Sequence, residues 1–246
     1  FSQFHQNIAD NCKFINNSAP RASVVYSQKS ITIGNNNYFE NNIATGSGSL
    51  AFATGSNNIV IGTGNVFINN VVKSAVLDAV NGYVKGSYAF FINNTGSYVI
   101  SGSTASSLEY CYWDTNDPDF STISGKTFAH DNYLVLGIKS DKDSIRVGEN
   151  ATITVNLTNQ NGEAVNIGLL PEYLPITFTS TNGDVSVQST KLVDAAASTE
   201  YTATIIGTGV VTANLYDGSA SVEINLLPAA GTVFVDYANG LDTNDG

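Results

Sequence analysis

Residues 65–70, Asn65-Val66-Phe67-Ile68-Asn69-Asn70, decide the fold because close copies of them recur along the first half of the chain. Each copy places an aromatic residue shortly before a pair of asparagines, and the aromatic positions are spaced by 25, 28, 24 and 22 residues. Repeats of this length are typical of solenoids, in which each repeat forms one coil. The other copies are Cys12-Lys13-Phe14-Ile15-Asn16-Asn17, Asn37-Tyr38-Phe39-Glu40-Asn41-Asn42, Ala89-Phe90-Phe91-Ile92-Asn93-Asn94 and, in degenerate form, Cys111-Tyr112-Trp113-Asp114-Thr115-Asn116.

The strand alternation assigns a direction to each column of equivalent repeat positions. The columns on either side of the aromatic residue contain charges, so we expect them to face outward and the aromatic residue to face inward. The first asparagine of each pair then also points inward, where stacked amides can hydrogen-bond to one another. We therefore predict an inward aromatic stack of Phe14, Phe39, Phe67, Phe91 and Trp113, and an inward asparagine ladder of Asn16, Asn41, Asn69 and Asn93.

Two further short apolar runs separate successive aromatic segments, for example Val24-Val25-Tyr26 and Ile31-Thr32-Ile33. Three short strands per coil predict a three-sided parallel β-helix, and parallel crossovers are nearly always right-handed. The segment Asn116-Asp117-Pro118-Asp119 breaks the strand pattern. We expect the solenoid to end there.

Beyond about Tyr133 the pattern becomes an apolar and polar alternation typical of antiparallel strands, punctuated by turn signals such as Asn161-Gly162 and Asp217-Gly218. About seven such strands without a cysteine predict an immunoglobulin-like sandwich that lacks the usual disulfide. The expected fold class is all-β. The expected domains are a right-handed parallel β-helix at residues 1–130, an Ig-like antiparallel β-sandwich at 131–228, and a linker with the start of a further module at 229–246.

The charge of the chain limits the classes of partner. Its 246 residues include 10 basic and 21 acidic side chains, a net charge of −11. This balance disfavours a nucleic-acid backbone or an anionic membrane surface. No apolar run is long enough to span a bilayer. We expect no nucleic-acid partner and no membrane insertion in this segment.

The residues that often bind metals or form disulfides are poorly placed for either role. Cys12 and Cys111 occupy one column four coils apart, roughly 19 Å at about 4.8 Å per coil, against a limit of about 7 Å between the Cα atoms of a disulfide. We expect two free, buried thiols. His5 and His130 lie outside any metal-ligand spacing. We expect no cofactor. The one candidate metal is calcium, which a loop rich in oxygen ligands could bind: Asp114, Asn116, Asp117 and Asp119. These residues lack the spacing of an EF-hand, and aspartate and asparagine also form ordinary turns.

Catalysis would need clustered side chains on one outer face. Parallel β-helices also carry polysaccharide lyases and hydrolases, whose chemistry depends on such carboxylates. The outward acids of the solenoid are scattered, and no pair recurs at the same height in adjacent coils. We therefore expect no catalytic residue and no enzyme, with a β-helix lyase or hydrolase as an alternative. These acids are chiefly Asp10, Glu40, Asp78 and Glu109.

The chain contains four Asn-X-Ser/Thr triplets, which are acceptor motifs for N-glycosylation. Those that begin at Asn16 and Asn93 belong to the predicted inward ladder, so we expect them to be inaccessible. Those that begin at Asn150 and Asn156 fall on the polar side of a predicted sandwich strand and are candidates for modification.

The repeated phrase Phe-Ile/Glu-Asn-Asn, the closing segment that contains Trp113 and the Ig-like repeat after it resemble adhesin-like surface proteins of methane-producing archaea. The resemblance covers the whole chain, although Asp114 departs from the usual residue after the tryptophan. It implies extracellular display on the cell envelope within a larger multi-module chain. It also implies binding to surface glycans or proteins of other cells, without catalysis. A purely structural spacer remains a third interpretation.

Overall fold

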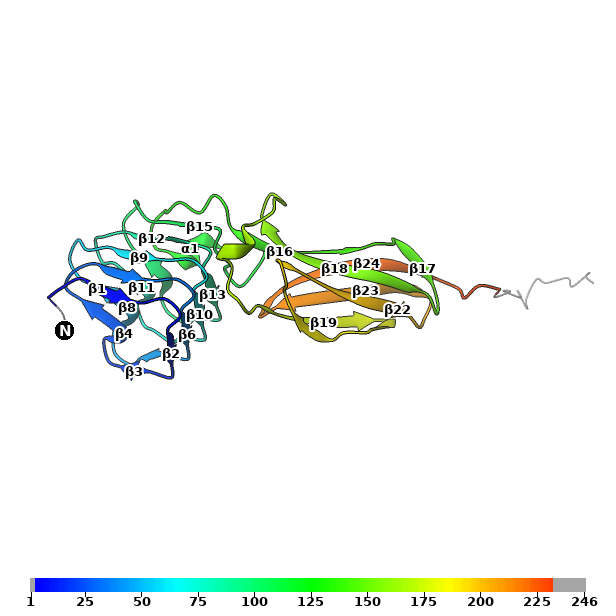
Figure 1. Cartoon of the computed structure of the whole chain (residues 1–246), viewed down its shortest axis with the longest axis horizontal. Helices are drawn as coiled ribbons and strands as arrows, with labels where there is room; N and C mark the ends of the chain where they lie inside the picture. Colours follow the sequence, from blue (N-terminus) through cyan, green and yellow to red (C-terminus); the bar gives the residue numbers. More distant parts are fainter. Residues whose placement is uncertain (1–2, 232–246) are drawn as a thin grey trace, which may run out of the picture.

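The structure is a computed structural model that describes residues 3–231. The chain forms a β-solenoid and a β-sandwich placed end to end along one axis (Figure 1). Within the described residues, helix is confined to α1 (Phe120–Ile123) and a single 3-10 turn, η1 (Ile167–Leu169). The all-β fold class is confirmed. Most of the expected start of a further module, residues 232–246, lies outside the described part.

Three parallel sheets form the sides of the solenoid, and each takes one strand from successive coils, for about four turns. The predicted parallel β-helix is therefore confirmed. The sheet that faces the sandwich is called the junction sheet here. The junction sheet contains β2 (Lys13–Ile15), β6 (Tyr38–Glu40), β10 (Val66–Ile68) and β13 (Phe90–Ile92); the second sheet contains β1 (Gln6–Ile8), β5 (Ile31–Ile33), β9 (Ile59–Ile61), β12 (Val84–Ser87) and β15 (Ser107–Glu109); the third contains β4 (Ala22–Ser27), β8 (Ser49–Ala53), β11 (Ala75–Asp78) and β14 (Tyr98–Ser101); β3 (Ser18–Ala19) pairs with β7 (Ile43–Ala44) at a corner.

The aromatic column forms one continuous stack inside the solenoid. The four successive ring pairs have centroid distances of 5.2, 4.6, 5.0 and 4.9 Å, and their planes lie within 9° of parallel. The stack exists because the coils pair in register, so that Phe14, Phe39, Phe67 and Phe91 occupy equivalent strand positions. Trp113 ends the column, one coil beyond Phe91.

The first asparagine of each pair is a corner residue with a left-handed backbone. Its φ lies between 45° and 58° in all four copies, and Asp114 takes the same conformation in the fifth, with φ 65°. Asparagine tolerates this region better than other residues with a side chain, which explains its recurrence there. The corner interrupts the strand alternation, so that the residue after it, and not the corner residue, points inward.

The prediction of an inward ladder at Asn16, Asn41, Asn69 and Asn93 is therefore wrong by one position. Asn16, Asn41 and Asn93 are exposed, and Asn69 is half-buried. The inward ladder is formed by the second asparagine of each pair. Its amide groups donate from one coil to the next over 2.8, 2.9 and 2.9 Å, in the order Asn17, Asn42, Asn70 and Asn94.

The segment after Trp113 forms a last, irregular coil, in which Ser124, Ala129 and Tyr133 still pair in parallel with the coil before it. Asp119 caps the N-terminus of α1, accepting a hydrogen bond from the Ser121 amide. This turn brings Phe120 and Phe128 edge-on against Trp113, at ring distances of 6.1 and 6.0 Å. The last coil therefore covers the end of the aromatic stack with its own side chains.

The two cysteines are free thiols in the column that also contains Asn37 and Asn65. Cys111 is fully buried, and burial raises the pKa of its thiol to about 12. Cys12 is only half-buried, contrary to expectation, because it lies in the first described coil, where fewer neighbours cover it.

Nine strands form the sandwich. Its two sheets, mainly antiparallel, enclose a core of alternating apolar side chains, as predicted for an Ig-like sandwich. Ile205 lies just beyond the strand that ends at Ala203 and is exposed. The first sheet contains β16 (Leu134–Ser140), β18 (Asn150–Asn159), β22 (Ala196–Ala203) and β20 (Gly183–Val185); the second contains β17 (Ser144–Arg146), β24 (Gly218–Leu227), β23 (Gly207–Leu215), β19 (Pro175–Thr181) and β21 (Ser189–Lys191).

Candidate functional site

The outer face of the junction sheet changes character between its second and third coils. All of its outer columns face away from the solenoid core, as predicted, but the later coils are apolar there and lie beneath the sandwich. Full burial of one such side chain contributes about 1.5–3 kcal/mol, so four of them contribute on the order of 6–12 kcal/mol to holding the two domains together. The four are Val66, Ile68, Phe90 and Ile92, each at most 7% exposed.

Polar contacts fix the geometry of this junction. The Tyr112 hydroxyl donates to the Leu215 carbonyl over 3.3 Å. A Cβ at Gly218 would overlap that hydroxyl, so only glycine permits the β23–β24 turn to approach so closely. Tyr88 has a left-handed backbone with φ 53°, unusual for a bulky residue, and its hydroxyl accepts a hydrogen bond from the Asn166 amide.

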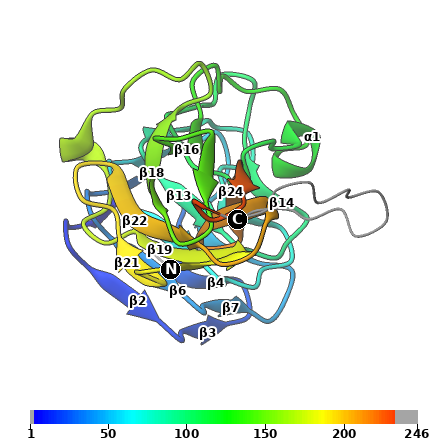
Figure 2. The same ribbon diagram turned by 90° about the vertical axis from the view of Figure 1, so that its right-hand side faces the viewer.

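The first two coils extend past the edge of the sandwich and leave a groove. In the view along the long axis, the sandwich overlies β13, whereas β2 and β6 lie toward the edge (Figure 2). The groove has a volume of about 770 Å³, within the range of small-molecule sites. Its solenoid wall is the outer face of β2 and β6, and its sandwich wall is the segment from Gly168 to Pro175 with Tyr216.

Each wall contributes aromatic and charged side chains. Tyr38 and Glu40 flank the inward Phe39 on β6, so the strand alternation directs both outward. Tyr173 lies between η1 and β19 and is 61% exposed. Tyr216 occupies the β23–β24 turn with φ 53°. The charged residues that line the groove are Lys13, Glu40 and Glu172.

The electrostatics of the groove keep Tyr38 and Tyr216 protonated. Burial raises the pKa of Tyr216 well above its ordinary value, and the nearby hydroxyl groups of Tyr38 and Tyr173 raise it further. Burial also raises the pKa of Tyr38, and the negative charge of Glu40 adds to this shift. Both hydroxyls are therefore neutral hydrogen-bonding groups at any physiological pH.

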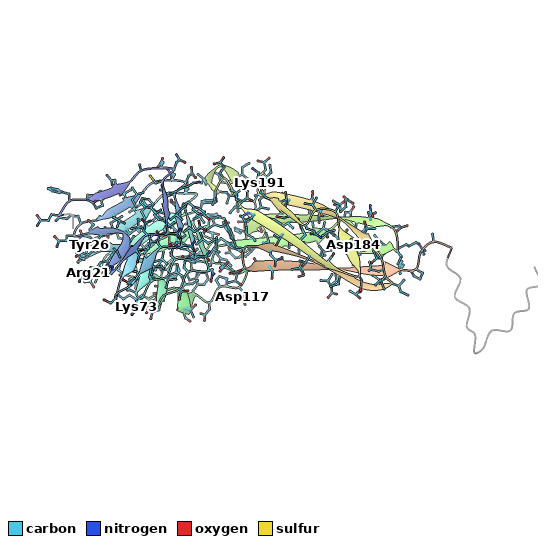
Figure 3. The ribbon with its side chains drawn as sticks, turned by 90° about the horizontal axis from the view of Figure 1, so that it is seen from below. Arg21, Tyr26, Lys73, Asp117, Asp184 and Lys191 are labelled. Atoms are coloured by element: carbon cyan, nitrogen blue, oxygen red, sulfur yellow. The ribbon has the colours of Figure 1, made fainter. Side chains whose placement is uncertain are left out.

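The structure does not bring the candidate calcium ligands together. The Asn116 side chain bonds the backbone of Leu136. Asp114 accepts from the Asn93 amide, and burial raises the pKa of its carboxyl. Asp119 caps α1, and Asp117 lies near the domain junction (Figure 3). Residues 3–231 contain no group of three or more histidine, cysteine, aspartate or glutamate side chains placed to share a metal ion.

Three of the four scattered acids of the solenoid bond to neighbouring parts of the chain. Asp10 accepts from the Asn35 amide, Glu109 from the Asn132 amide, and Asp78 from the hydroxyls of two serines. Glu40 is the acid that lines the groove.

Apart from the groove, the third sheet carries a smaller group of aromatic and basic side chains. The Arg21 guanidinium lies 5.6 Å from the centre of the Tyr26 ring, which in turn packs against Phe52. Figure 3 shows Arg21, Tyr26 and Lys73 on this side of the solenoid. These residues do not line the groove.

The glycosylation candidates fall in different settings. Asn150 is exposed and Asn156 is half-buried, both on the outer side of β18. They remain candidates for modification. The expectation that Asn16 and Asn93 are inaccessible is wrong, because both are exposed corner residues.

No protein-family model matches the chain, and no curated protein matches it at a significant level. Parts of the chain are similar to solved structures of surface proteins. A C-terminal 282-residue fragment of intimin, in complex with the intimin-binding domain of the translocated intimin receptor, is 27% identical over 38% of this chain and 32% of its own, with a TM-score of 0.29. Domains 1–6 of the surface layer protein SbsC are 19% identical over 42% of this chain and 14% of theirs, with a TM-score of 0.30. Domains 4 and 5 of SbsC are 20% identical over 42% of this chain and 50% of theirs, with a TM-score of 0.29.

This chain thus spans about a third of the intimin fragment and a smaller share of the six SbsC domains. Similarity of this extent is local and defines no family. Among residues 3–231, no helix has both the length and the apolar character needed to cross a membrane.

The groove residues do not stand out in the sequence, although one signal points to them. The two outer columns read Lys13 and Ile15, then Tyr38 and Glu40, before they become apolar at Val66. This change marks the coil at which the sandwich begins to cover the junction sheet. Tyr173 and Tyr216 carry no comparable signal, because their place beside β6 depends on the packing of the two domains.

Proposed function

We propose that the chain is a non-catalytic extracellular module of an adhesin-like protein, displayed on the cell surface as part of a larger multi-module chain. It binds surface polymers or proteins of other cells through the groove at the domain junction, and needs no cofactor. The repeated aromatic-Asn-Asn phrase and the Trp113 segment, which resemble adhesin-like proteins of methane-producing archaea, support this proposal.

The composition of the groove carries the proposal. Three tyrosines gather there from three separate segments of the chain, although each is far from the others in sequence. Tyr173 leaves most of its ring in solvent. Tyrosine is enriched at binding surfaces because it combines a large apolar ring with a polar hydroxyl. Exposed rings beside carboxylates are characteristic of a recognition surface.

Binding of the labelled full chain to microbial cells and insoluble surface polymers tests this function. Tyr173→Ala is expected to weaken binding at least about tenfold, since aromatic residues at the centre of an interface dominate its energy. The variant leaves the core intact, because Tyr173 is largely exposed. The matched control is Tyr98→Ala, which removes a 38%-exposed tyrosine from β14, on a sheet that does not line the groove. Equal binding by wild type and Tyr173→Ala would contradict the proposal.

Two alternatives predict different outcomes when the chain is incubated with the same cells and polymers. A β-helix lyase or hydrolase would release unsaturated or reducing ends from polysaccharides. The structural roles of Asp10, Asp78 and Glu109 favour the non-catalytic function, because these carboxylates accept hydrogen bonds within the fold. A purely structural spacer would bind none of the cells or polymers.

A further inference from the structure

We infer that the groove takes an uncharged oligosaccharide segment of a surface polysaccharide. The inference rests on the proposed function and names the class of ligand for the same site. It follows from three properties of the groove: its aromatic rings, its mixture of hydrogen-bonding groups and its charge.

The aromatic residues of the groove are all tyrosines. A pyranose ring has an apolar C–H face and a polar rim, so a tyrosine can stack on the face while its hydroxyl bonds the rim. Tyr173 presents an accessible ring on the sandwich wall, and Tyr38 and Tyr216 are half-buried beside it. The apolar side chains of Leu170 and Pro171 also line the groove and offer no competing polar contact.

The polar groups of the groove both donate and accept hydrogen bonds. Glu40 and Glu172 supply carboxylate acceptors, Lys13 supplies a donor, and the amides of Asn11 and Asn36 supply both. Sugar hydroxyls also donate and accept. An uncharged sugar can therefore pair with every group in this set without leaving a buried charge unpaired.

The charge of the groove argues against an acidic ligand. One lysine and two glutamates line it, which leaves a local charge of −1, and the whole chain carries −11. Uronic or sulfated polymers would meet repulsion both inside the groove and during approach. The groove is therefore expected to discriminate against the acidic polysaccharides that also occur on cell surfaces.

The geometry also disfavours an extended peptide. The groove lies over the outer face of the junction sheet, where the backbone groups of β6 are hydrogen-bonded to β2 and β10. A peptide that binds by strand addition needs a free sheet edge, and among the strands of this wall only β2 has one, on the side away from β6. The side chains of this face instead provide a platform for stacking.

Calorimetric titration of the full chain tests the inference with four kinds of probe: hexamers of β-1,4-linked glucose, of mannose and of N-acetylglucosamine as uncharged probes, and a galacturonic acid hexamer as the acidic one. At least one uncharged hexamer is expected to bind more tightly than the galacturonate. Tyr173→Ala should weaken that binding at least about tenfold, and Tyr98→Ala should leave it unchanged. Glu40→Gln should narrow the difference in affinity between the uncharged hexamer and the galacturonate, because it removes one negative charge from the groove.

The possible failures are distinguishable. If binding to cells depends on Tyr173 but the galacturonate hexamer is the tighter ligand, the ligand class is wrong and the groove function stands. The ligand class is also wrong if cell binding depends on Tyr173 and no uncharged hexamer binds. If cells bind equally well to wild type and Tyr173→Ala, the proposed function of the groove fails, and the inference fails with it.

Discussion

Replacing Asn70 by alanine tests the buried asparagine ladder most sharply, because the neighbouring Asn69 provides a matched control. The Asn70 amide donates to the Phe39 carbonyl and to Asn94, both over 2.9 Å. It accepts from the backbone and the side chain of Asn42 over 3.0 and 2.9 Å. Alanine removes all four bonds from a fully buried site.

The magnitude follows from these contacts. A net loss of about 0.5–1.5 kcal/mol per hydrogen bond gives a destabilisation of about 2–6 kcal/mol, and the groups left unpaired move the expected value to about 4 kcal/mol. Asn69→Gly removes only the contact with the exposed Asn93 and keeps the left-handed corner, so it should cost less than about 1 kcal/mol.

Urea denaturation at a common slope gives both changes in the free energy of unfolding. Hydrogen exchange adds a local check, since the Asn42 amide should lose protection in Asn70→Ala alone. The reasoning is refuted if Asn69→Gly is the more destabilising variant, or if Asn70→Ala costs less than about 1 kcal/mol.

The other predictions concern the aromatic stack and the junction. Phe67→Ala should lower the free energy of unfolding by about 3–5 kcal/mol, because the Phe67 ring is fully buried between the rings of Phe39 and Phe91. Phe14→Ala, at the half-buried end of the stack, should lower it by at most about half as much. Equal losses for the two variants in urea titrations would contradict the stack. Gly218→Ala should cost about 1–3 kcal/mol and speed proteolysis at the junction, because its Cβ overlaps the Tyr112 hydroxyl; an unchanged cleavage rate would count against the tight approach. Burial raises the pKa of the Asp114 carboxyl, so the folded state binds this proton more strongly than the unfolded state does, and the stability of the wild type should fall as pH rises from about 4 through the raised pKa. Asp114→Asn should remove this pH dependence and be more stable than the wild type at pH 7. A pH profile of stability that is the same in both proteins would show that the carboxyl has no such role.

The solenoid could be predicted because its signals are local and repeated. Period-two alternation within a strand, combined with a fixed repeat register, places Phe39 above Phe14 and below Phe67. The predicted asparagine ladder is displaced by one residue because the alternation does not continue through the corner. Asparagine adopts positive φ more readily than most residues, which would have assigned the corner to Asn41 and the inward ladder position to Asn42.

The groove could not be predicted from the sequence in the same way. Tyr38 and Tyr216 are brought together by the packing of two domains, and no repeat or spacing relates them. Only the solenoid wall left a trace, in the change from Tyr38 and Glu40 to the apolar Val66 and Ile68. The depth of the groove depends on how far the sandwich covers the junction sheet, which is a property of side-chain packing.

The central claim is that ligand binds where the first two coils meet the sandwich. Hydrogen–deuterium exchange of the full chain, with and without a saturating oligosaccharide or polymer that it binds, tests this claim most directly. Protection is expected in residues 36–40 of the solenoid and 168–175 of the sandwich together, because the groove is formed by both. Protection confined to the third sheet, around Arg21 and Tyr26, or to the far end of the sandwich would contradict it.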